Sequence, residues 1–260
     1  MSAVADAVPL GTMLKDWRRR RRLSQLDLAL EAGVSARHLS FVETGRSKPS
    51  REMVIHLAEQ LDVPLRDRNH LLLAAGYAPA YGEHPLDAPE MAPVRAAIDG
   101  VLAGHAPFPA IAVDRWWNLV AANEPLGLLT EGVAPELMEP PVNALRVALH
   151  PDGMAPRILN LGQYRAHLLD RLRREVALTA DERLAALHDE LSAYPAPPAP
   201  PTPAHPEIAS PLRLRARDRE LVFFNTIATF GTALDITLAE LSIEAFFPAD
   251  PETAAALRAP

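Results

Sequence analysis

Cysteine is absent from the 260-residue chain, and this absence excludes several kinds of protein. A disulfide scaffold, a thiolate nucleophile and a zinc site built on sulfur all require cysteine. Aromatic residues are also scarce, at 5%, yet 48% of the residues are hydrophobic and the mean hydropathy is −0.02. Such a composition is typical of a folded globular protein with one large domain or two smaller ones.

Long apolar runs and a secretory leader are missing as well. No stretch approaches the roughly 20 apolar residues that a helix needs to cross a bilayer. The first nine residues lack the basic-then-apolar order of a signal peptide. We therefore expect a cytoplasmic protein without a membrane partner.

Lysine is rare, since 24 of the 26 basic residues are arginine and only Lys15 and Lys48 are lysine. The net charge of −7 is unevenly distributed along the chain. Residues 1–75 hold 12 basic and 9 acidic side chains, a net charge of +3, whereas the remainder holds 14 basic and 24 acidic ones, a net charge of −10. This asymmetry predicts that only the N-terminal part approaches a polyanion such as DNA.

The first 75 residues show five short helical patterns with clear end signals. Serine stands at three expected N-caps, at Ser24, Ser35 and Ser50. Glycine follows the last apolar residue of two patterns, at Gly33 and Gly45. The first pattern leads into five arginines at residues 18–22, which form either a solvated helix face or a contact to a DNA backbone. The fifth covers about residues 66–75. We predict a compact all-α domain over residues 1–76.

Residues 23–45 have the pattern of a helix-turn-helix. Ala29 is small where the second helix must approach the first, and Gly33 permits the turn. The pattern leaves four positions of the second helix exposed, namely Ala36, Arg37, Ser40 and Phe41. Arg37 can donate two hydrogen bonds to guanine O6 and N7 in a major groove. Phe41 either contacts a thymine methyl group or packs on a neighbouring helix.

The N-terminal part resembles the lambda-repressor-like, XRE-type regulators continuously from Leu10 to about Leu61. The resemblance lies in residues 23–25 (LSQ), 32–35 (AGVS), 39–40 (LS), 42–46 (VETGR) and 48–50 (KPS). It implies that Ala36, Arg37, Ser40 and Phe41 contact the bases of double-stranded operator DNA. It also implies that phosphates are held by Gln25, Ser35, Arg46 and Lys48.

The rest of the chain mixes helical and strand-like patterns behind a Pro-, Tyr- and Gly-rich linker at residues 77–93. Helices are expected at about 94–105, 143–149, 161–176 and 181–194, and strands at 110–113, 117–121, 212–216, 221–229 and 238–246. Eight prolines in residues 195–211 predict an extended loop. Because strands lie on both sides of a helical block, we predict one α+β domain over residues 94–260 with an antiparallel sheet.

Enzymatic signatures are missing from this second part, which has no Gly-rich phosphate loop, nucleophile elbow or paired metal-binding histidines. Hence we expect no catalytic residues, no metal site and no enzyme activity. Polar residues do recur at helical spacing between apolar ones, at Asn143, Arg146, His150, His167 and Arg171. They either line the mouth of a pocket for a carboxylate or form ordinary solvated and ion-paired helix faces.

The second part resembles the MmyB-like regulators. The resemblance lies in residues 114–117 (DRWW), 121–123 (AAN), 143–146 (NALR), 149–151 (LHP), 167–174 (HLLDRLRR), 223–226 (FFNT), 230–232 (FGT), 237–241 (TLAEL) and 246–250 (FFPAD). It implies a ligand-binding domain of PAS-like α+β fold, and a fatty acid as the bound ligand with no other cofactor. Asn143, Arg146, His150, His167 and Arg171 are the candidate ligand-binding residues.

The sequence therefore predicts a transcription regulator that acts as a homodimer on a pseudo-palindromic operator and binds a small apolar carboxylate. A second hypothesis is a regulator that senses heme or flavin. A third is a regulator whose second domain serves only for dimerisation or protein recruitment. An enzyme with a DNA-binding appendage is disfavoured because the sequence supplies no catalytic group.

Overall fold

The computed structural model describes residues 8–198, 210–216 and 219–258. The chain divides into two compact units, the first formed mainly by the chain up to His84 and the second mainly by the chain from Pro85 onward.

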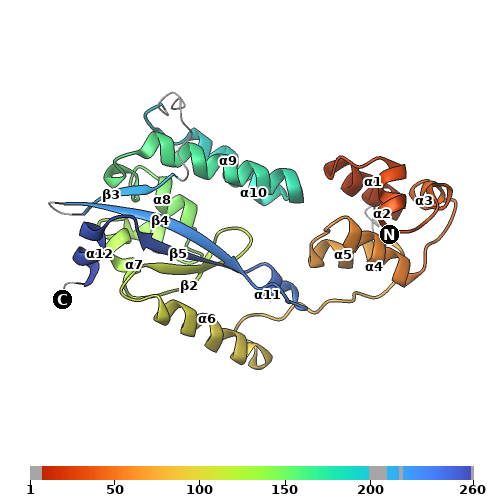
Figure 1. Ribbon diagram of the computed structural model, residues 1–260, viewed down its shortest axis with the longest axis horizontal. Coiled ribbons are helices and arrows are strands. Elements are labelled where there is room, and N and C mark those ends of the chain that lie inside the picture. The colour runs from red at the N-terminus through yellow and green to blue at the C-terminus, as the bar shows by residue number, and fades with distance from the viewer. Residues whose placement is uncertain (1–7, 199–209, 217–218, 259–260) are drawn as a thin grey trace, which may run out of the picture. The chain divides into compact units, whose positions relative to one another are not determined.

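The first unit consists of helices, as the sequence predicts (Figure 1). They are α1 (Leu10–Arg20), α2 (Gln25–Glu31), α3 (Ala36–Glu43), α4 (Arg51–Gln60) and α5 (Leu65–Ala74). The side chains of Ser24, Ser35 and Ser50 each accept a hydrogen bond from the backbone N–H three residues further on. The expected N-caps of α2, α3 and α4 are thereby confirmed, and each satisfies an N–H that the helix itself leaves without a partner.

Leucines from all five helices build the core of the first unit. Seven of them have at most 1% of their surface exposed: Leu14, Leu28, Leu39, Leu57, Leu61, Leu71 and Leu72. Burying each such side chain contributes about 1.5–3 kcal/mol to folding. Helices this short have little stability alone, so this shared core holds α3 in place.

The second unit combines helices with one antiparallel sheet, which confirms the predicted α+β class. Its helices are α6 (Ala92–Gly104), α7 (Leu126–Thr130), α8 (Ala144–Leu149), α9 (Leu161–Thr179), α10 (Glu182–Ala193), α11 (Ile236–Ala239) and α12 (Pro251–Arg258). Three 3-10 turns lie at η1 (Pro89–Met91), η2 (Pro135–Met138) and η3 (Ala155–Arg157). The strands are β1 (Ala110–Val113), β2 (Leu119–Ala122), β3 (Leu212–Ala216), β4 (Arg219–Thr229) and β5 (Ser242–Pro248).

The sheet has the strand order β2-β1-β5-β4-β3, with every neighbouring pair antiparallel. Two hairpins, β1–β2 and β3–β4, are joined by β5, which pairs with β1 on one side and with β4 on the other. As Figure 1 shows, α6 lies on one side of the sheet and α8, α9 and α10 lie on the other. Side chains that alternate along β5 therefore face two different cores.

The predicted strand at residues 238–246 is wrong at its start. Residues 236–239 form α11, and β5 begins only at Ser242 and continues to Pro248. Short apolar runs do not distinguish a strand from a helical turn by periodicity, and Leu238 and Ala239 are good helix formers. Helices α7 and α12 were not expected either. The predicted proline-rich loop falls largely on residues 199–209, which lie outside the described residues.

Candidate nucleic-acid interface and ligand cavity

A tight turn sets the direction of α3 relative to α2. Gly33 has a φ of 63°, a conformation that glycine adopts without steric cost. The N–H of Val34 donates to the carbonyl of Ala29 at 2.9 Å, and Ala29 is 2% exposed, so the two helices approach closely. The structure thus provides the local geometry that residues 23–45 predict for a helix-turn-helix.

Helix α3 buries one face and exposes the other. Leu39 and Val42 are buried in the core, whereas Arg37 is exposed and Ala36, Ser40 and Phe41 are half-buried. The guanidinium of Arg37 lies over the ring of Phe41, with 5.4 Å between the central carbon and the ring centroid. Within the described ranges the Arg37 side chain makes no hydrogen bond or ion pair, so its donors are available to an external acceptor.

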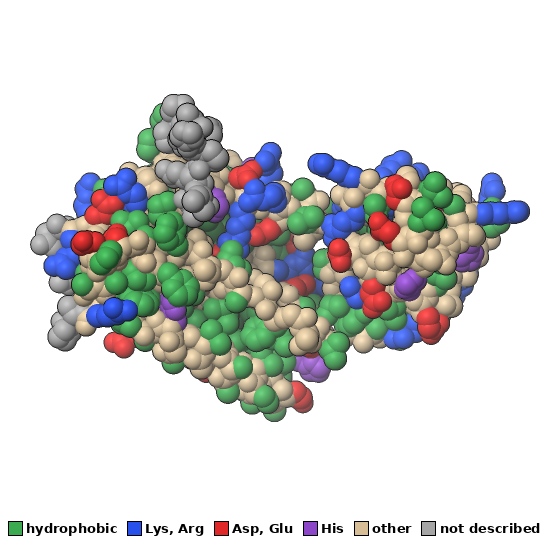
Figure 2. All heavy atoms as spheres, in the orientation of Figure 1, with side chains coloured by type: hydrophobic (Ala, Val, Ile, Leu, Met, Phe, Trp, Pro, Cys, Tyr) green, Lys and Arg blue, Asp and Glu red, His purple; other side chains and the backbone are tan. Residues whose placement is uncertain are grey.

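The predicted phosphate-binding residues surround α3. Arg46 and Lys48 are exposed in the segment after the helix, and Ser35 is the N-cap of α3. Gln25 differs, because its side-chain amide donates to Glu43 at 2.7 Å. A phosphate would therefore meet the backbone at the start of α2 or displace that bond. Figure 2 shows Lys and Arg side chains projecting from this unit with Asp and Glu side chains between them.

The arginine run at residues 18–22 is divided between core and surface. Arg18 is buried and donates to both carboxylate oxygens of Glu43, at 2.7 and 2.9 Å, and to the carbonyl of Leu23 at 2.8 Å. Burial raises the pKa of Glu43, but the hydrogen bonds from Arg18 and Gln25 outweigh it and hold that pKa below its usual value. This network ties α1 to the end of α3.

Arg21 binds the carbonyls of Leu61 and Asp62, whereas Arg19 and Arg20 are exposed. The run is thus neither a uniformly solvated face nor a continuous basic surface.

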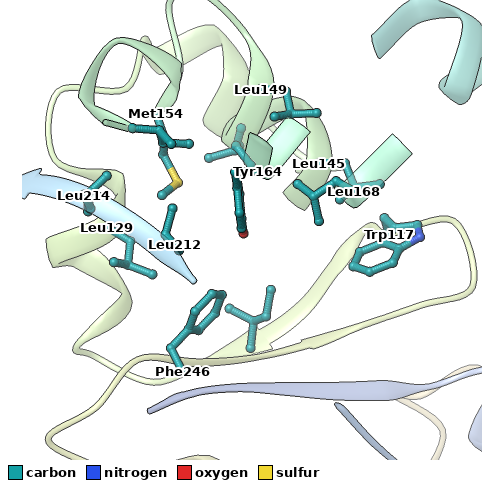
Figure 3. Close-up of a cluster of buried hydrophobic side chains, with 14 of the residues drawn as sticks. Trp117, Leu129, Leu145, Leu149, Met154, Tyr164, Leu168, Leu212, Leu214 and Phe246 are labelled. Atoms are coloured by element: carbon teal, nitrogen blue, oxygen red, sulfur yellow. The ribbon is translucent and has the colours of Figure 1, made fainter. Parts of the chain in front are cut away.

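An apolar cavity lies in the second unit, between α7, α8 and α9 and the face of the sheet that α9 covers. Figure 3 shows the cluster of buried side chains around it. The apolar lining includes Ile111, Trp117, Leu119, Leu126, Leu129, Met138, Val142, Leu145, Met154, Leu168, Leu212 and Phe246. The cavity has a volume of about 60 Å³, against about 300–1,000 Å³ for typical small-molecule pockets. A large ligand would have to displace some of these side chains.

Three polar side chains, those of Thr130, Tyr164 and Glu244, interrupt this apolar lining. Tyr164 on α9 is 5% exposed, and in Figure 3 its hydroxyl points into the middle of the cluster. Glu244 on β5 is 6% exposed and also lines the cavity. Burial raises the pKa of both groups, and the charge of Glu244 raises the pKa of Tyr164 further.

Arg171 connects Glu244 to the wall of the cavity. It donates to Glu244 at 2.6 Å and to Glu175 at 3.1 Å. Its guanidinium lies 4.1 Å from the ring centroid of Trp117, whose indole N–H donates to Glu175 at 2.9 Å. Arg171, a predicted ligand-binding residue, is therefore engaged by two carboxylates and an aromatic ring.

Asn143 and Arg146 lie at a different place. Together with Trp116, Asn118, Arg183 and Glu190 they line an open polar groove. Asn143 is the N-cap of α8 and donates to the carbonyl of Trp116 at 2.8 Å. Arg146 forms a two-pronged pair with Glu190 at 2.7 and 2.8 Å.

His150 and His167 belong to neither the cavity nor this groove. The His150 ring contacts that of Tyr194 at 5.0 Å, and His167 is exposed on α9. The five predicted residues thus occupy several places rather than one pocket mouth. Tyr164 and Glu244, which do line the cavity, were not among the predicted ligand-binding residues. The signal for Glu244 is an acidic residue between Ile243 and Ala245 in an apolar strand.

The first two residues of the DRWW segment at residues 114–117 have structural roles. Asp114 accepts from the N–H groups of Trp116 and Asn118 at 2.8 Å and so shapes the β1–β2 turn. Arg115 pairs with Asp181 at 2.9 Å and with Glu240 at 2.7 Å, as a structural arginine would.

The described residues contain neither a membrane-spanning helix nor a cluster of metal ligands. None of the helices there combines the length and the apolar character that crossing a membrane requires. Nor do any three His, Asp or Glu side chains within the described ranges gather closely enough to hold a metal ion.

Comparison with known proteins gives two family matches. Residues 94–259 match the MmyB-like transcription regulator ligand binding domain, and residues 14–67 match the helix-turn-helix family. Two relatives are similar over shorter stretches. The uncharacterized HTH-type transcriptional regulator RghRB of Bacillus subtilis (strain 168) is 35% identical over 83 residues, which is 32% of this chain and 58% of that protein. The ImmF control region 10 kDa protein of Bacillus phage phi105 is 33% identical over 60 residues, 23% of this chain and 67% of that protein.

Proposed function

Because the chain belongs to the MmyB-like transcription regulators, we propose that it controls transcription by binding operator DNA through α3 and a fatty acid in the cavity of its second unit. The chain is a DNA-binding regulator with a ligand-binding domain. The finer proposal depends on one observation: the same chain has an exposed arginine without a hydrogen bond or ion pair within the described ranges, on the outer face of α3, and an apolar cavity.

On the DNA side, the exposed face of α3 enters a major groove. Arg37 reads guanine, and Ala36, Ser40 and Phe41 contact neighbouring base edges. Ser35, Gln25, Arg46 and Lys48 hold phosphates, which fixes the register of the helix without reading sequence. A single helix-turn-helix unit makes few base contacts, so the protein binds as a homodimer to an operator with two-fold symmetry.

On the ligand side, the apolar lining covers an acyl chain. Met138 and Met154 have flexible side chains that can move aside as a chain enters. Binding affects DNA affinity only if the ligand prefers one of two conformations of the protein. The reciprocal effect follows, because operator DNA must change fatty-acid affinity by the same factor.

Operator DNA for the test is selected from random duplexes with the full-length protein. Fluorescence anisotropy then measures operator affinity with and without decanoate. We expect decanoate to change the dissociation constant about fivefold or more, a typical coupling between two sites. Ala148→Phe, which fills the cavity from its wall, should abolish the effect and keep operator binding.

An unchanged affinity combined with no decanoate binding would contradict the ligand proposal. Absorbance of the purified protein tests the heme or flavin hypothesis, since either group gives a visible band. Intact operator binding without any decanoate binding would support a second domain used only for dimerisation or recruitment, and decanoate binding that leaves operator affinity unchanged would contradict the coupling.

A further inference from the structure

Strand β4 is longer than the strand beside it, and its second half has a free edge. β3 pairs with β4 only as far as Leu212, which lies opposite Phe223. From Phe224 to Thr229, β4 pairs with β5 alone, and Figure 1 shows β4 running on past β3. Within the described ranges, no backbone hydrogen bond forms on the other side of this half. The sheet therefore ends there in an open strand edge.

The backbone groups at this edge follow from the alternation of an antiparallel ladder. The carbonyl of Val222 accepts from the N–H of Ala249 at 2.8 Å, and Ala249 directly follows β5. Every second residue of β4 points its backbone groups to the same side, whereas the residues between them point to the opposite side. Asn225, Ile227 and Thr229 therefore each direct one N–H donor and one C=O acceptor away from β5.

The side chains at this edge do not protect it from pairing. Residues 226–229 are all exposed, and Ile227 is 44% exposed. Residues 221–231 include neither a charged residue nor a proline, and β4 and β5 keep one register over residues 223–229 of β4. Native proteins blunt a free edge with lysine, proline or a bulge, because an unprotected edge pairs with another chain. We therefore expect another strand to cover this edge in the assembled protein.

A second copy of the same strand fits this edge. Two antiparallel strands of identical sequence can be related by a two-fold axis, and Ile227 is the central residue of the range 225–229. With Ile227 opposite its own counterpart, Asn225 lies opposite Thr229 of the partner subunit, so all of the outward backbone groups are paired. Charge favours the same contact. Residues 76–260 carry a net charge of −10, so two copies repel each other least where they meet along an uncharged edge.

We propose that residues 225–229 of β4 form a dimer interface, in which the edges of two copies pair antiparallel about a two-fold axis at Ile227. The two five-stranded sheets then form one continuous sheet across the dimer. This inference rests on the proposed function, because it names the surface through which the homodimer forms. It does not involve the cavity, so it is independent of the ligand.

The absence of cysteine allows a direct test by cross-linking of the full-length protein. In Ile227→Cys the new residue would face its counterpart with about 5.5 Å between the Cα atoms, a separation that a disulfide spans. The matched control is Phe224→Cys, because Phe224 lies on the same strand and is 41% exposed. There the two cysteines would be six residues out of register, or about 20 Å apart.

We expect Ile227→Cys to give a covalent dimer with copper phenanthroline as the oxidant, and Phe224→Cys to give little or none. Non-reducing gel electrophoresis measures both yields. The covalent dimer of Ile227→Cys should return to monomer with dithiothreitol.

A lysine at the two-fold axis tests how much the edge contributes to dimer stability. Ile227→Lys introduces the residue with which natural edges avoid pairing, and it places two like charges opposite each other. Sedimentation equilibrium of the full-length protein should show a dimer Kd about tenfold weaker or more. Leu234→Lys, at a position that follows β4 and is 79% exposed, is the matched control and should leave the Kd unchanged. Thermal unfolding checks that each variant is folded.

The outcomes separate the inference from the proposed function. If the wild-type protein is a dimer but Ile227→Cys cross-links no better than Phe224→Cys, the dimer forms through another surface. The inference is then wrong and the homodimer stands. An unchanged Kd in Ile227→Lys leads to the same conclusion. If the wild-type protein stays monomeric both alone and on its selected operator, the inference and the proposed homodimer both fail. The cross-linking comparison decides the matter if Ile227→Lys does not fold.

Discussion

The buried pair between Arg18 and Glu43 should make a large and measurable contribution to the stability of the DNA-binding unit. Their side chains are 9% and 2% exposed, and Arg18 makes two hydrogen bonds to Glu43 and one to the Leu23 carbonyl. Arg18→Met leaves the Glu43 carboxylate buried with only Gln25 as a donor. Removing one partner of a buried pair costs about 3–5 kcal/mol.

The double variant Arg18→Met/Glu43→Leu should behave differently from the two single variants. Replacing both charges by apolar groups of similar size is often neutral or stabilising. We therefore expect each single variant to lose about 3–5 kcal/mol and the double variant to lose at most about 1 kcal/mol. The resulting coupling free energy would be about 5 kcal/mol or more.

Hydrogen exchange measured by mass spectrometry on the full-length protein reports this stability locally, because peptides from α1 to α3 give the opening free energy of the first unit alone. Arg19→Met is the matched control, since Arg19 is exposed one position further along α1. It should change the opening free energy by about 0.5 kcal/mol or less. A loss of stability in Arg18→Met no larger than that in Arg19→Met, or a double-variant loss equal to the sum of the single losses, would contradict a stabilising role of the buried pair.

The same pair predicts how stability depends on pH. Glu43 has its pKa held below the ordinary value of 4.5 in the folded protein: burial raises it, but the bonds from Arg18 and Gln25 lower it more. Its stabilising contribution is therefore complete above pH 4.5 and is lost as the pH falls through the lowered pKa. In Arg18→Met the sign reverses, because protonation relieves an unpaired buried charge. The deficit of that variant should shrink toward low pH.

The remaining predictions concern DNA reading and two glycines. Arg37→Ala should weaken binding to the selected operator by about 1–3 kcal/mol in anisotropy titrations and spare the weak, salt-sensitive binding to random DNA; an equal loss on both would make Arg37 a phosphate contact. Gly11→Ala should destabilise the first unit by about 2 kcal/mol or more, because a Cβ there would lie 2.3 Å from the carbonyl oxygen of Glu43. Gly100→Ala, at a helical position with open space around the added carbon, should instead stabilise the second unit by about 0.5–1 kcal/mol in the corresponding exchange measurement.

The DNA-binding unit could be predicted almost completely from the sequence because its signals are local. A serine that accepts a hydrogen bond from the N–H three residues further on, and a glycine at φ 63°, act within one turn of chain, and both occur as expected at Ser24 and Gly33. The burial of Arg18 could not be predicted in this way. Its partner Glu43 is 25 residues away, and a run of five arginines gives no sign of which one faces inward.

The order of the sheet was similarly beyond the reach of local patterns. Strand β5 lies between two hairpins that are separated by about 90 residues of sequence, and its pairing is decided by tertiary contacts. The start of that strand was misplaced because residues 236–239 are apolar enough for either structure. Register and strand order depend on which faces must be buried, and that depends on the whole unit.

The candidate ligand residues show most clearly why polar spacing alone is ambiguous. Arg146 and Arg171 both recur at helical spacing among apolar residues, yet one lies in an open groove and the other beside the cavity. What distinguishes them is the strand opposite: β5 places Glu244 on the face that α9 covers, on the same side as Phe246. An acidic residue at an inward position of a strand needs a partner, and Arg171 provides it. That partnership, together with the hydrogen bond to Glu175, makes Arg171 an ion-paired arginine beside the cavity.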